Sequence, residues 1–214
     1  QSKPIFRRPI EEPYRYWKYL SKSNSWDSVM GLFGKSIDEY YQDWAPYYET
    51  SKKLALQKQY ELAIKYFDKV LEIRPQQLES LFSKSLSLYY LERYDESVSL
   101  YLKIIKLDPH NSEARNNICY SLLAQDKLEE AIVYLDEVIK IEPTNWSQIN
   151  NKSAALGKLG RYEEAIECID VLLKANPTYV DGWYNKGNAL KELGRDKEAE
   201  ECFTKAKRIR WILN

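Results

Sequence analysis

Hydrophobic residues recur along most of this chain with the spacing of amphipathic helices. Within residues 112–145, Ile118 and Leu122 lie four positions apart and define one helical face. Leu135 and Val138, three positions apart, define a second face after a short polar break. Apolar residues at these spacings lie on the same side of a helix, so the segment is predicted to form two helices joined by a turn.

Prolines set the period with which this pattern repeats. Proline cannot continue a helix interior, so each of the four regularly spaced prolines is expected to follow and end a second helix. A fixed period in this range indicates a repeat architecture. Pro75, Pro109, Pro143 and Pro177 stand 34 residues apart and divide the chain into five predicted units, 44–77, 78–111, 112–145, 146–179 and 180–213.

Small and large residues recur at fixed places when the positions of each unit are numbered from 1 to 34. Small residues recur where two helices must approach closely, and large apolar residues recur where a gap must be filled. Gly160 and Gly194 fall between the two helices of their units, where glycine suits a left-handed helix C-terminus. The small residues are Ser51, Ser85, Cys119, Ser153 and Gly187 at place 8 and Ala63, Ser97, Ala131, Ala165 and Ala199 at place 20, and the large ones are Phe67, Tyr101, Leu135, Ile169 and Phe203 at place 24.

The repeated pattern resembles that of the tetratricopeptide repeat family. The resemblance is carried by the segments LGRYEEAI at 159–166 and WYNKGNAL at 183–190, and it extends over 44–213. Arg115 and Trp211 depart from the family pattern, because they stand in place of an aromatic residue and a proline. The resemblance implies an all-α fold, a right-handed α-solenoid of about five tandem helix-turn-helix repeats. It also implies that the first helices line a concave groove that holds a protein or peptide partner.

Residues 1–43 do not follow the repeat and are rich in proline and aromatic residues. We expect an extended stretch over 1–12, a short helix over 13–20 and a longer one over 26–44, with Ser25 as its N-cap. The expected role is a cap over the open end of the first unit, because solenoids need atypical terminal units. The alternatives are a second recognition surface built from exposed aromatic residues and a segment that orders only with a partner.

The resemblance places positions 2, 5, 6, 9, 12 and 13 of each unit in the groove. Place 6 holds three consecutive asparagines, Asn117, Asn151 and Asn185. An amide side chain both donates and accepts, so such a ladder suits the backbone of an extended peptide. The alternative is that asparagine is simply a frequent and soluble residue at this place. The other peptide-binding candidates are Asn116, Asn150, Asn188, Tyr48, Phe82, Tyr89, Tyr120 and Tyr184.

These candidates make the N-terminal half of the predicted groove aromatic and its C-terminal half rich in amides. Exposed aromatic side chains on such a surface suggest anchoring pockets for a ligand. The alternative is that the N-terminal segment folds back and fills the aromatic half. Place 2 includes Glu79, Glu113 and Asp181, and these carboxylates argue against a grip on a C-terminal carboxylate, because like charges repel.

Charge and hydropathy narrow the classes of partner. The chain has 32 Lys and Arg against 32 Asp and Glu, so its formal net charge is zero. A nucleic-acid binder usually shows a basic excess, and no nucleic-acid partner is expected. No run of about 18 apolar residues is present, so no membrane span is predicted. A cytoplasmic location is expected. Because the chain begins with Gln1, the possibility of a processed or trimmed upstream segment stays open.

Candidate chemistry is sparse. Cys119, Cys168 and Cys202 are scattered and form no CxxC pair, so we expect free thiols and neither a disulfide framework nor a metal site. His110, the sole histidine, falls in a turn between units, and no helical His/Glu or His/Cys pair accompanies it. No catalytic residue, metal or cofactor is therefore predicted, and the chain is not expected to be an enzyme.

The leading hypothesis is a protein–protein interaction scaffold or adaptor that binds an extended peptide or a partner helix in its groove. One alternative is a structural subunit that self-assembles into a homo-oligomer, or joins a larger complex, through its aromatic N-terminal segment. A second alternative is an accessory domain of a longer protein.

Overall fold

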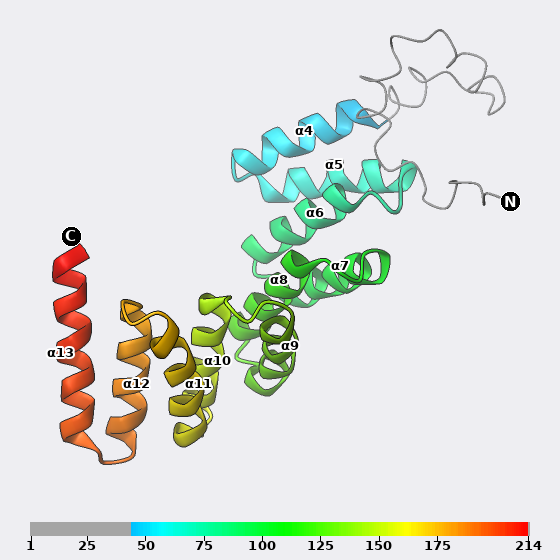
Figure 1. Ribbon diagram of the computed structural model, residues 1–214. Helices are drawn as coiled ribbons and strands as arrows, with labels where there is room; N and C mark the ends of the chain where they lie inside the picture. Colours follow the sequence, from blue (N-terminus) through cyan, green and yellow to red (C-terminus); the bar gives the residue numbers. More distant parts are fainter. Residues whose placement is uncertain (1–43, 214) are drawn as a thin grey trace, which may run out of the picture. The chain divides into compact units, whose positions relative to one another are not determined.

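The computed structural model of the protein describes residues 44–213 (Figure 1). Within this range the chain folds into ten α-helices joined by short turns, and it has no strand. The predicted all-α fold of helix-turn-helix repeats, an α-solenoid, is confirmed. The elements expected over 1–12, 13–20 and 26–44, and the cap that they were expected to form, lie outside the described residues.

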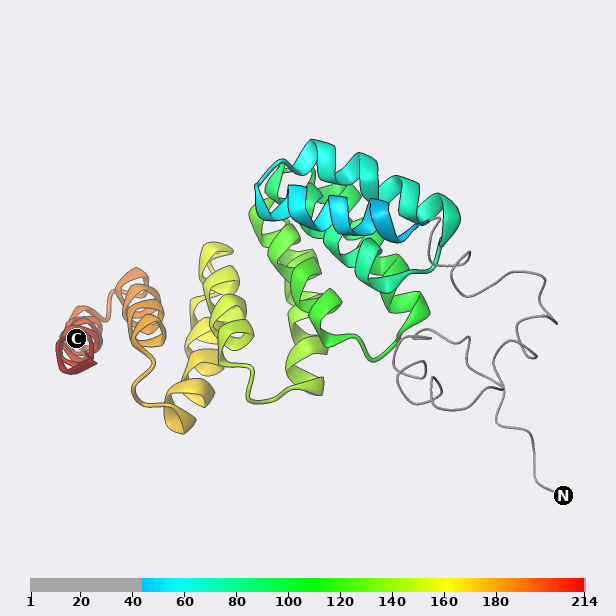
Figure 2. The same ribbon diagram turned by 90° about the horizontal axis from the view of Figure 1, so that it is seen from above.

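The helices follow one another as hairpins, which Figure 2 shows from above. The described residues divide into two compact units, 44–87 and 88–213, and the boundary falls within one helix. In the second unit each helix from α8 onward packs against the next one in sequence. The helices are α4 (Ala45–Leu56), α5 (Tyr60–Ile73), α6 (Leu78–Tyr90), α7 (Tyr94–Leu107), α8 (Ser112–Ala124), α9 (Leu128–Ile141), α10 (Trp146–Lys158), α11 (Tyr162–Ala175), α12 (Val180–Glu192) and α13 (Asp196–Leu213).

The turn inside each hairpin contains one residue in the left-handed region of the backbone. Gly160 and Gly194 have φ of 75° and 72°, as the sequence predicted. Lys58, Glu92 and Asp126 take the same place in the other hairpins with φ of 60°, 60° and 58°. A residue with a side chain pays about 1–2 kcal/mol for this conformation, so the packing of the flanking helices must hold it there.

The turn between hairpins depends on the prolines. The residue before each of Pro75, Pro109, Pro143 and Pro177 is the C-cap of the second helix, and its φ lies between −124° and −130°. Proline pushes the preceding residue out of the helical region, and each second helix therefore ends there. Trp211 stands where a further proline would fall, and α13 continues to 18 residues where the other second helices have 14.

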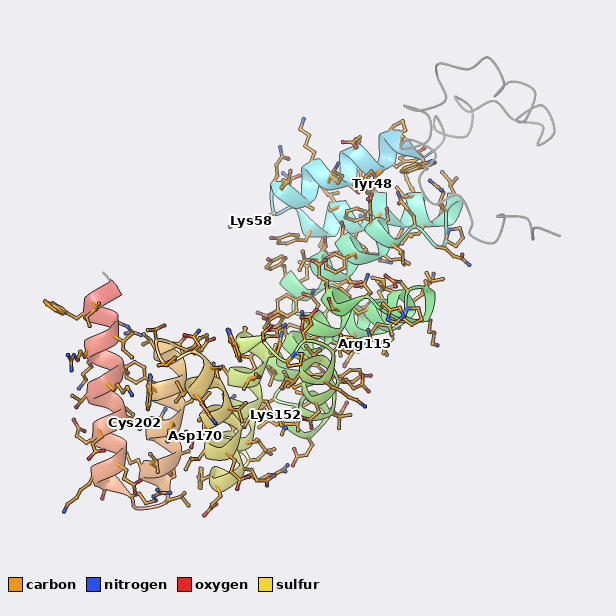
Figure 3. The ribbon with its side chains drawn as sticks, in the orientation of Figure 1. Tyr48, Lys58, Arg115, Lys152, Asp170 and Cys202 are labelled. Atoms are coloured by element: carbon orange, nitrogen blue, oxygen red, sulfur yellow. The ribbon has the colours of Figure 1, made fainter. Side chains whose placement is uncertain are left out.

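Arg115 stands where the family pattern has an aromatic residue, but it makes the same hydrogen bond that an aromatic residue makes in another hairpin. Trp183 Nε1 donates a hydrogen bond to the carbonyl of Pro177, at 2.8 Å. Arg115 Nη2 donates to the carbonyl of Pro109, at 2.7 Å, from the equivalent place in an earlier hairpin (Figure 3). A guanidinium and an indole both supply a planar N–H donor, so either can tie the first helix of a hairpin to the turn before it.

Lysine–aspartate pairs join a second helix to the first helix that follows it. Lys84 meets Asp68 at 2.5 Å, and Lys152 meets Asp136 at 2.5 Å. Lys186 repeats this pairing with Asp170 at 2.6 Å. These partly exposed pairs contribute only about 0–1 kcal/mol each. Their regular recurrence indicates that they help to set the register of neighbouring hairpins.

The core confirms the predicted columns of small and large residues. Ala131 and Ala165 are buried, as are the large side chains of Leu135 and Ile169. Gly187 shows why the small places must be small. A Cβ atom at this glycine would lie 2.5 Å from a ring carbon of Phe203, well inside van der Waals contact.

Two glycines in first helices are expected to respond in opposite ways to alanine. Gly187→Ala forces the ring of Phe203 to shift, and we expect it to lower stability by about 1–3 kcal/mol. Gly157 has no atom within 4 Å of an added Cβ. Gly157→Ala should therefore raise stability by about 0.5–1 kcal/mol through helix propensity alone. Urea unfolding of both variants measures the two effects, and a gain in stability from Gly187→Ala would contradict the packing described above.

The cysteines are expected to react slowly in the folded protein. All three are free thiols, and burial raises the pKa of each, that of Cys119 to about 12. The thiolate is the reactive form, so a raised pKa lowers its population at pH 8. Alkylation by iodoacetamide, followed by mass spectrometry, should label Cys119 far more slowly in buffer than in urea. Equal labelling rates in the two conditions would show that Cys119 is not buried.

Candidate peptide-binding surface

Polar side chains line one face of each first helix in the second unit. On α8, Glu113, Asn116, Asn117 and Tyr120 follow the spacing i, i+3, i+4, i+7, which places them on one side of the helix. The same places recur on α10 and α12. We call the three stripes together the first-helix surface, and its other members are Ser147, Asn150, Asn151 and Ala154 on α10 and Asp181, Tyr184, Asn185 and Asn188 on α12.

Two contacts join these stripes into one surface. The Tyr120 hydroxyl lies 3.4 Å from Ser147 Oγ, which connects α8 to α10. Asn185 Nδ2 donates to Asn150 Oδ1 at 2.8 Å, which connects α12 to α10. The structure therefore brings together amides from helices that are one repeat apart in the chain. It also pairs place 6 of one unit with place 5 of the unit before it.

The three asparagines of the predicted ladder use their amide nitrogens within the protein. Asn117 Nδ2 donates to the carbonyl of Glu113 at 2.8 Å. Asn151 Nδ2 donates to Gln148 Oε1 at 3.2 Å, and Asn185 Nδ2 bonds to Asn150 as described. No described residue donates to the Oδ1 atom of any of the three. Each ladder amide therefore keeps one N–H and both lone pairs of its oxygen for a ligand, so its acceptor capacity is the larger.

Other predicted site residues differ in what they contact. Tyr184 contacts α13. Its ring centroid lies 6.2 Å from that of Phe203 and 5.3 Å from the guanidinium carbon of Arg210. Asn188 is exposed on α12. Asn116 Oδ1 is buried and has no hydrogen-bond partner among the described residues. A buried acceptor without a donor is rare in folded proteins, and the sequence contained no signal for it.

The aromatic candidates are divided between the two compact units. In the first unit, the Tyr48 hydroxyl donates to Glu79 at 2.8 Å, and burial together with this bond raises its pKa above the usual range. Phe82 is half-buried on α6. In the second unit, Tyr89 lies in edge-to-face contact with Tyr90 and Tyr94. Tyr48 and Phe82 therefore belong to the first unit, and Tyr89 and Tyr120 to the second.

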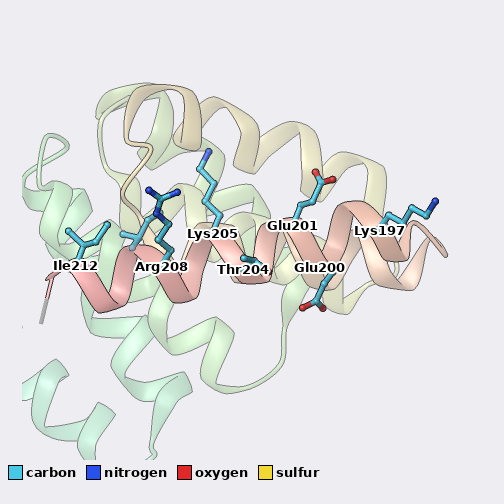
Figure 4. A pocket seen from close by; sticks show the side chains of 8 residues that line it. Lys197, Glu200, Glu201, Thr204, Lys205, Arg208 and Ile212 are labelled. Carbon is cyan, nitrogen blue, oxygen red and sulfur yellow. The ribbon is translucent and has the colours of Figure 1, made fainter.

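Two hollows lie on other surfaces of the second unit. One of about 830 Å³ runs along the outer side of α13, past Lys205 and Arg208 (Figure 4). Another of about 300 Å³ lies among α9, α10 and α11, beside Cys168. On α13, Glu200 takes the place at which α11 has Ile166 packed against the following hairpin. At this place α13 therefore has a carboxylate where α11 has an apolar side chain, while Ile209 and Ile212 line another part of the same hollow.

The described residues show no cluster of three or more His, Cys, Asp and Glu side chains able to hold a metal ion. Between residues 44 and 213, no helix has both the length and the apolar character needed to cross a membrane.

Stacked helical hairpins with a regular period define a helical repeat protein. Two tetratricopeptide repeat models match residues 149–179 and 180–210, and the model for subunit 3 of the anaphase-promoting complex, or cyclosome, matches 56–138. The chain is a tetratricopeptide repeat protein. No curated protein matches the sequence closely enough to be counted as a relative.

Several solved structures share this fold. A MamA double mutant is 19% identical, with a TM-score of 0.74, over 80% of this chain and 97% of its own. A MamA fragment from Desulfovibrio magneticus is 20% identical, with a TM-score of 0.73, over 78% of this chain and 95% of its own. YrrB, described as a tetratricopeptide repeat protein with an unusual peptide-binding site, is 21% identical, with a TM-score of 0.68, over 83% of this chain and 91% of its own.

The ladder asparagines are expected to differ in their effect on stability. Gln148 is only 1% exposed, and Asn151 donates to its Oε1 atom. Asn151→Ala leaves this acceptor without a donor and should cost about 1–3 kcal/mol. Asn117 donates to a backbone carbonyl of its own helix, so Asn117→Ala should cost less. Thermal melts of the two variants measure the difference, and an equal cost would contradict the assigned bonds.

Proposed function

We propose that the protein is an interaction scaffold whose first-helix surface binds an extended peptide segment of a partner protein. In this proposal the chain recognises a partner and does not catalyse a reaction. Helices α8 to α13 of the second unit provide the frame for that surface.

The main support for this proposal is the direction of the hydrogen bonds made by the three asparagines. Their nitrogens donate within the protein at 2.8, 3.2 and 2.8 Å, so their side chains are held in place before a ligand arrives. Side chains that are already ordered lose less entropy on binding. Their Oδ1 atoms suit the backbone N–H groups of an extended chain, which are donors that every peptide carries except at proline.

The repeat spacing fits this role. Stacked helices lie about 8–10 Å apart, and an extended peptide advances about 3.3 Å per residue. One asparagine would therefore meet the peptide backbone at about every third residue. Recognition through backbone groups favours a grip that tolerates different side chains, and the flanking tyrosines would add selectivity.

The fold neighbours are compatible with such a role. YrrB is described as having a peptide-binding site, and its structure covers most of this chain. At 21% identity this likeness concerns the fold, so the assignment to this chain rests on the amide geometry above.

Removing two of the acceptors is expected to weaken peptide binding. The variant Asn117→Ala with Asn185→Ala removes two neutral hydrogen bonds and should cost about 1–3 kcal/mol of binding free energy. Asn151 is left intact because it supports the buried Gln148. Peptides selected from a random display library against the wild-type protein serve as ligands, and calorimetric titration measures their affinity.

Thr204→Ala is the matched control for this experiment. Thr204 is an exposed residue on the outer side of α13, away from the first-helix surface, and its loss should leave the affinity unchanged. If the double variant binds the selected peptides as tightly as the wild type, the asparagines are not ligand contacts. If the control weakens binding equally, the peptides bind elsewhere.

A further inference from the structure

Tyr89 of the second unit is in ring contact with two other tyrosines, and Tyr120 interacts with it electrostatically. The asparagine ladder does not explain this grouping. The ring centroid of Tyr89 lies 5.8 Å from that of Tyr90 and 5.4 Å from that of Tyr94, in edge-to-face arrangements. Burial raises the pKa of Tyr89, and the neighbouring Tyr94, Tyr90 and Tyr120 add to the effect. We call Tyr89, Tyr90, Tyr94 and Tyr120 the tyrosine patch.

The tyrosine patch remains partly open to solvent. Tyr90 is 55% exposed and Tyr120 is 37% exposed, although both are large apolar rings. Tyr120 also belongs to the first-helix surface and lies beside Ser147. Exposed aromatic rings next to a polar surface are characteristic of recognition sites, because they provide contact area at a low cost in conformational entropy.

Asn116 supplies a second and independent indication of a ligand. It precedes Tyr120 by one helical turn, so the two side chains lie on the same face of α8. Its Oδ1 atom is buried and receives no hydrogen bond from the described residues. Leaving a buried acceptor unpaired costs about 1–3 kcal/mol, a cost that a donor from a ligand would remove.

The charges of the first-helix surface determine which charged residues a ligand can carry next to its bound segment. Its charged side chains, Glu113 and Asp181, are both acidic and both exposed. Glu113 begins the same stripe of α8 that carries Asn116 and Tyr120. A basic residue in the ligand would therefore be attracted to the α8 end of this surface, and an acidic one repelled there, whereas Arg210 places a cation beside Tyr184 at the α12 end.

The chemistry of the patch fits a proline-bearing chain. Proline rings pack flat against aromatic rings, and aromatic-lined surfaces bind segments in the polyproline II conformation. Such a segment has no internal hydrogen bonds, so its carbonyls remain ready to accept from tyrosine hydroxyls. A non-proline residue next to the prolines would supply the N–H for Asn116.

We infer that the tyrosine patch and Asn116 bind an extended, proline-containing segment of a partner protein with at least one flanking Lys or Arg. This inference rests on the proposed function, because it names the class of peptide that the first-helix surface takes. Tyr120 is its central contact, Tyr90 extends the aromatic area and Asn116 sets the position of one backbone N–H.

A designed probe tests this inference directly. The probe is a dye-labelled peptide of about ten residues with proline at every third position and arginine at one end, a length that spans about 30 Å in polyproline II form. Fluorescence anisotropy measures its affinity for the full chain. Replacing the prolines by alanine, or the arginine by glutamate, should each weaken binding about tenfold or more. Raising the salt concentration should reduce the contribution of the arginine to the affinity.

Protein variants separate the role of each contact. Tyr120→Ala should weaken binding of the probe about tenfold, whereas Tyr120→Phe should retain most of it because the ring remains. Asn116→Leu should leave the melting temperature unchanged or raised, since it removes an unpaired polar group, and should weaken binding about threefold or more. Trp211→Ala, which removes an aromatic residue that is 82% exposed on α13, is the control and should bind normally.

The outcomes distinguish this inference from the proposed function. If the alanine probe binds as tightly as the proline probe and its binding still depends on Asn117 and Asn185, the proline inference is wrong and the proposed function stands. If peptide binding depends on neither the asparagines nor the tyrosines, both are wrong. If light scattering shows a dimer that Tyr120→Ala dissociates, the patch is an interface between two copies of the chain, and the inference is overturned.

Discussion

The close approach of the two helices within each hairpin is the constraint on which the other features depend. Ser153 Oγ on α10 donates to the carbonyl of Ala165 on α11 at 2.9 Å, which requires small residues at both places. Gly187 lies so near the ring of Phe203 that even one added carbon would collide with it. Interiors are packed to near-crystalline density, so a small residue on one helix and a large one on the other must be matched at each level. This matching fixes how closely the two helices of each hairpin approach, and therefore how the first helix is oriented on the second.

Contacts between hairpins transmit this geometry along the second unit. Proline ends each second helix up to α11 at the same point, and a planar N–H donor from Trp183 or Arg115 ties the next first helix to the turn. The pairing of Lys152 with Asp136 recurs one repeat later between Lys186 and Asp170. Each of these interactions is weak alone, but a repeat array adds them at every junction. The stripes of α8, α10 and α12 come to lie side by side as a result.

The proposed ligand surface is a product of that alignment. Asn150 and Asn185 are 35 residues apart in sequence, and they meet only because α10 and α12 stack in register. The bond between them uses the nitrogen of Asn185 and so leaves its oxygen for a ligand. At the other end of the surface, Asn116, one helical turn before Tyr120, has an oxygen without a donor among the described residues. A surface with held amides and one unsatisfied acceptor is better organised for binding than a row of solvated asparagines would be.

The sequence by itself determined the helical hairpins, their period, the residues that end them and the small and large places of the core. Each of these follows from the local preferences of proline and glycine or from hydrophobic periodicity, which a single chain displays directly. The sequence also identified the asparagine column and the aromatic residues as candidates. Only the three-dimensional structure decided that the ladder amides donate to other groups of the protein, that Tyr184 contacts α13 and that Asn116 Oδ1 has no donor among the described residues. Those outcomes depend on which atoms come within hydrogen-bond or ring-contact distance, inside one helix for Asn117 and Asn151 and between helices for Asn185 and Tyr184. Residue types at a given spacing carry no information at that scale.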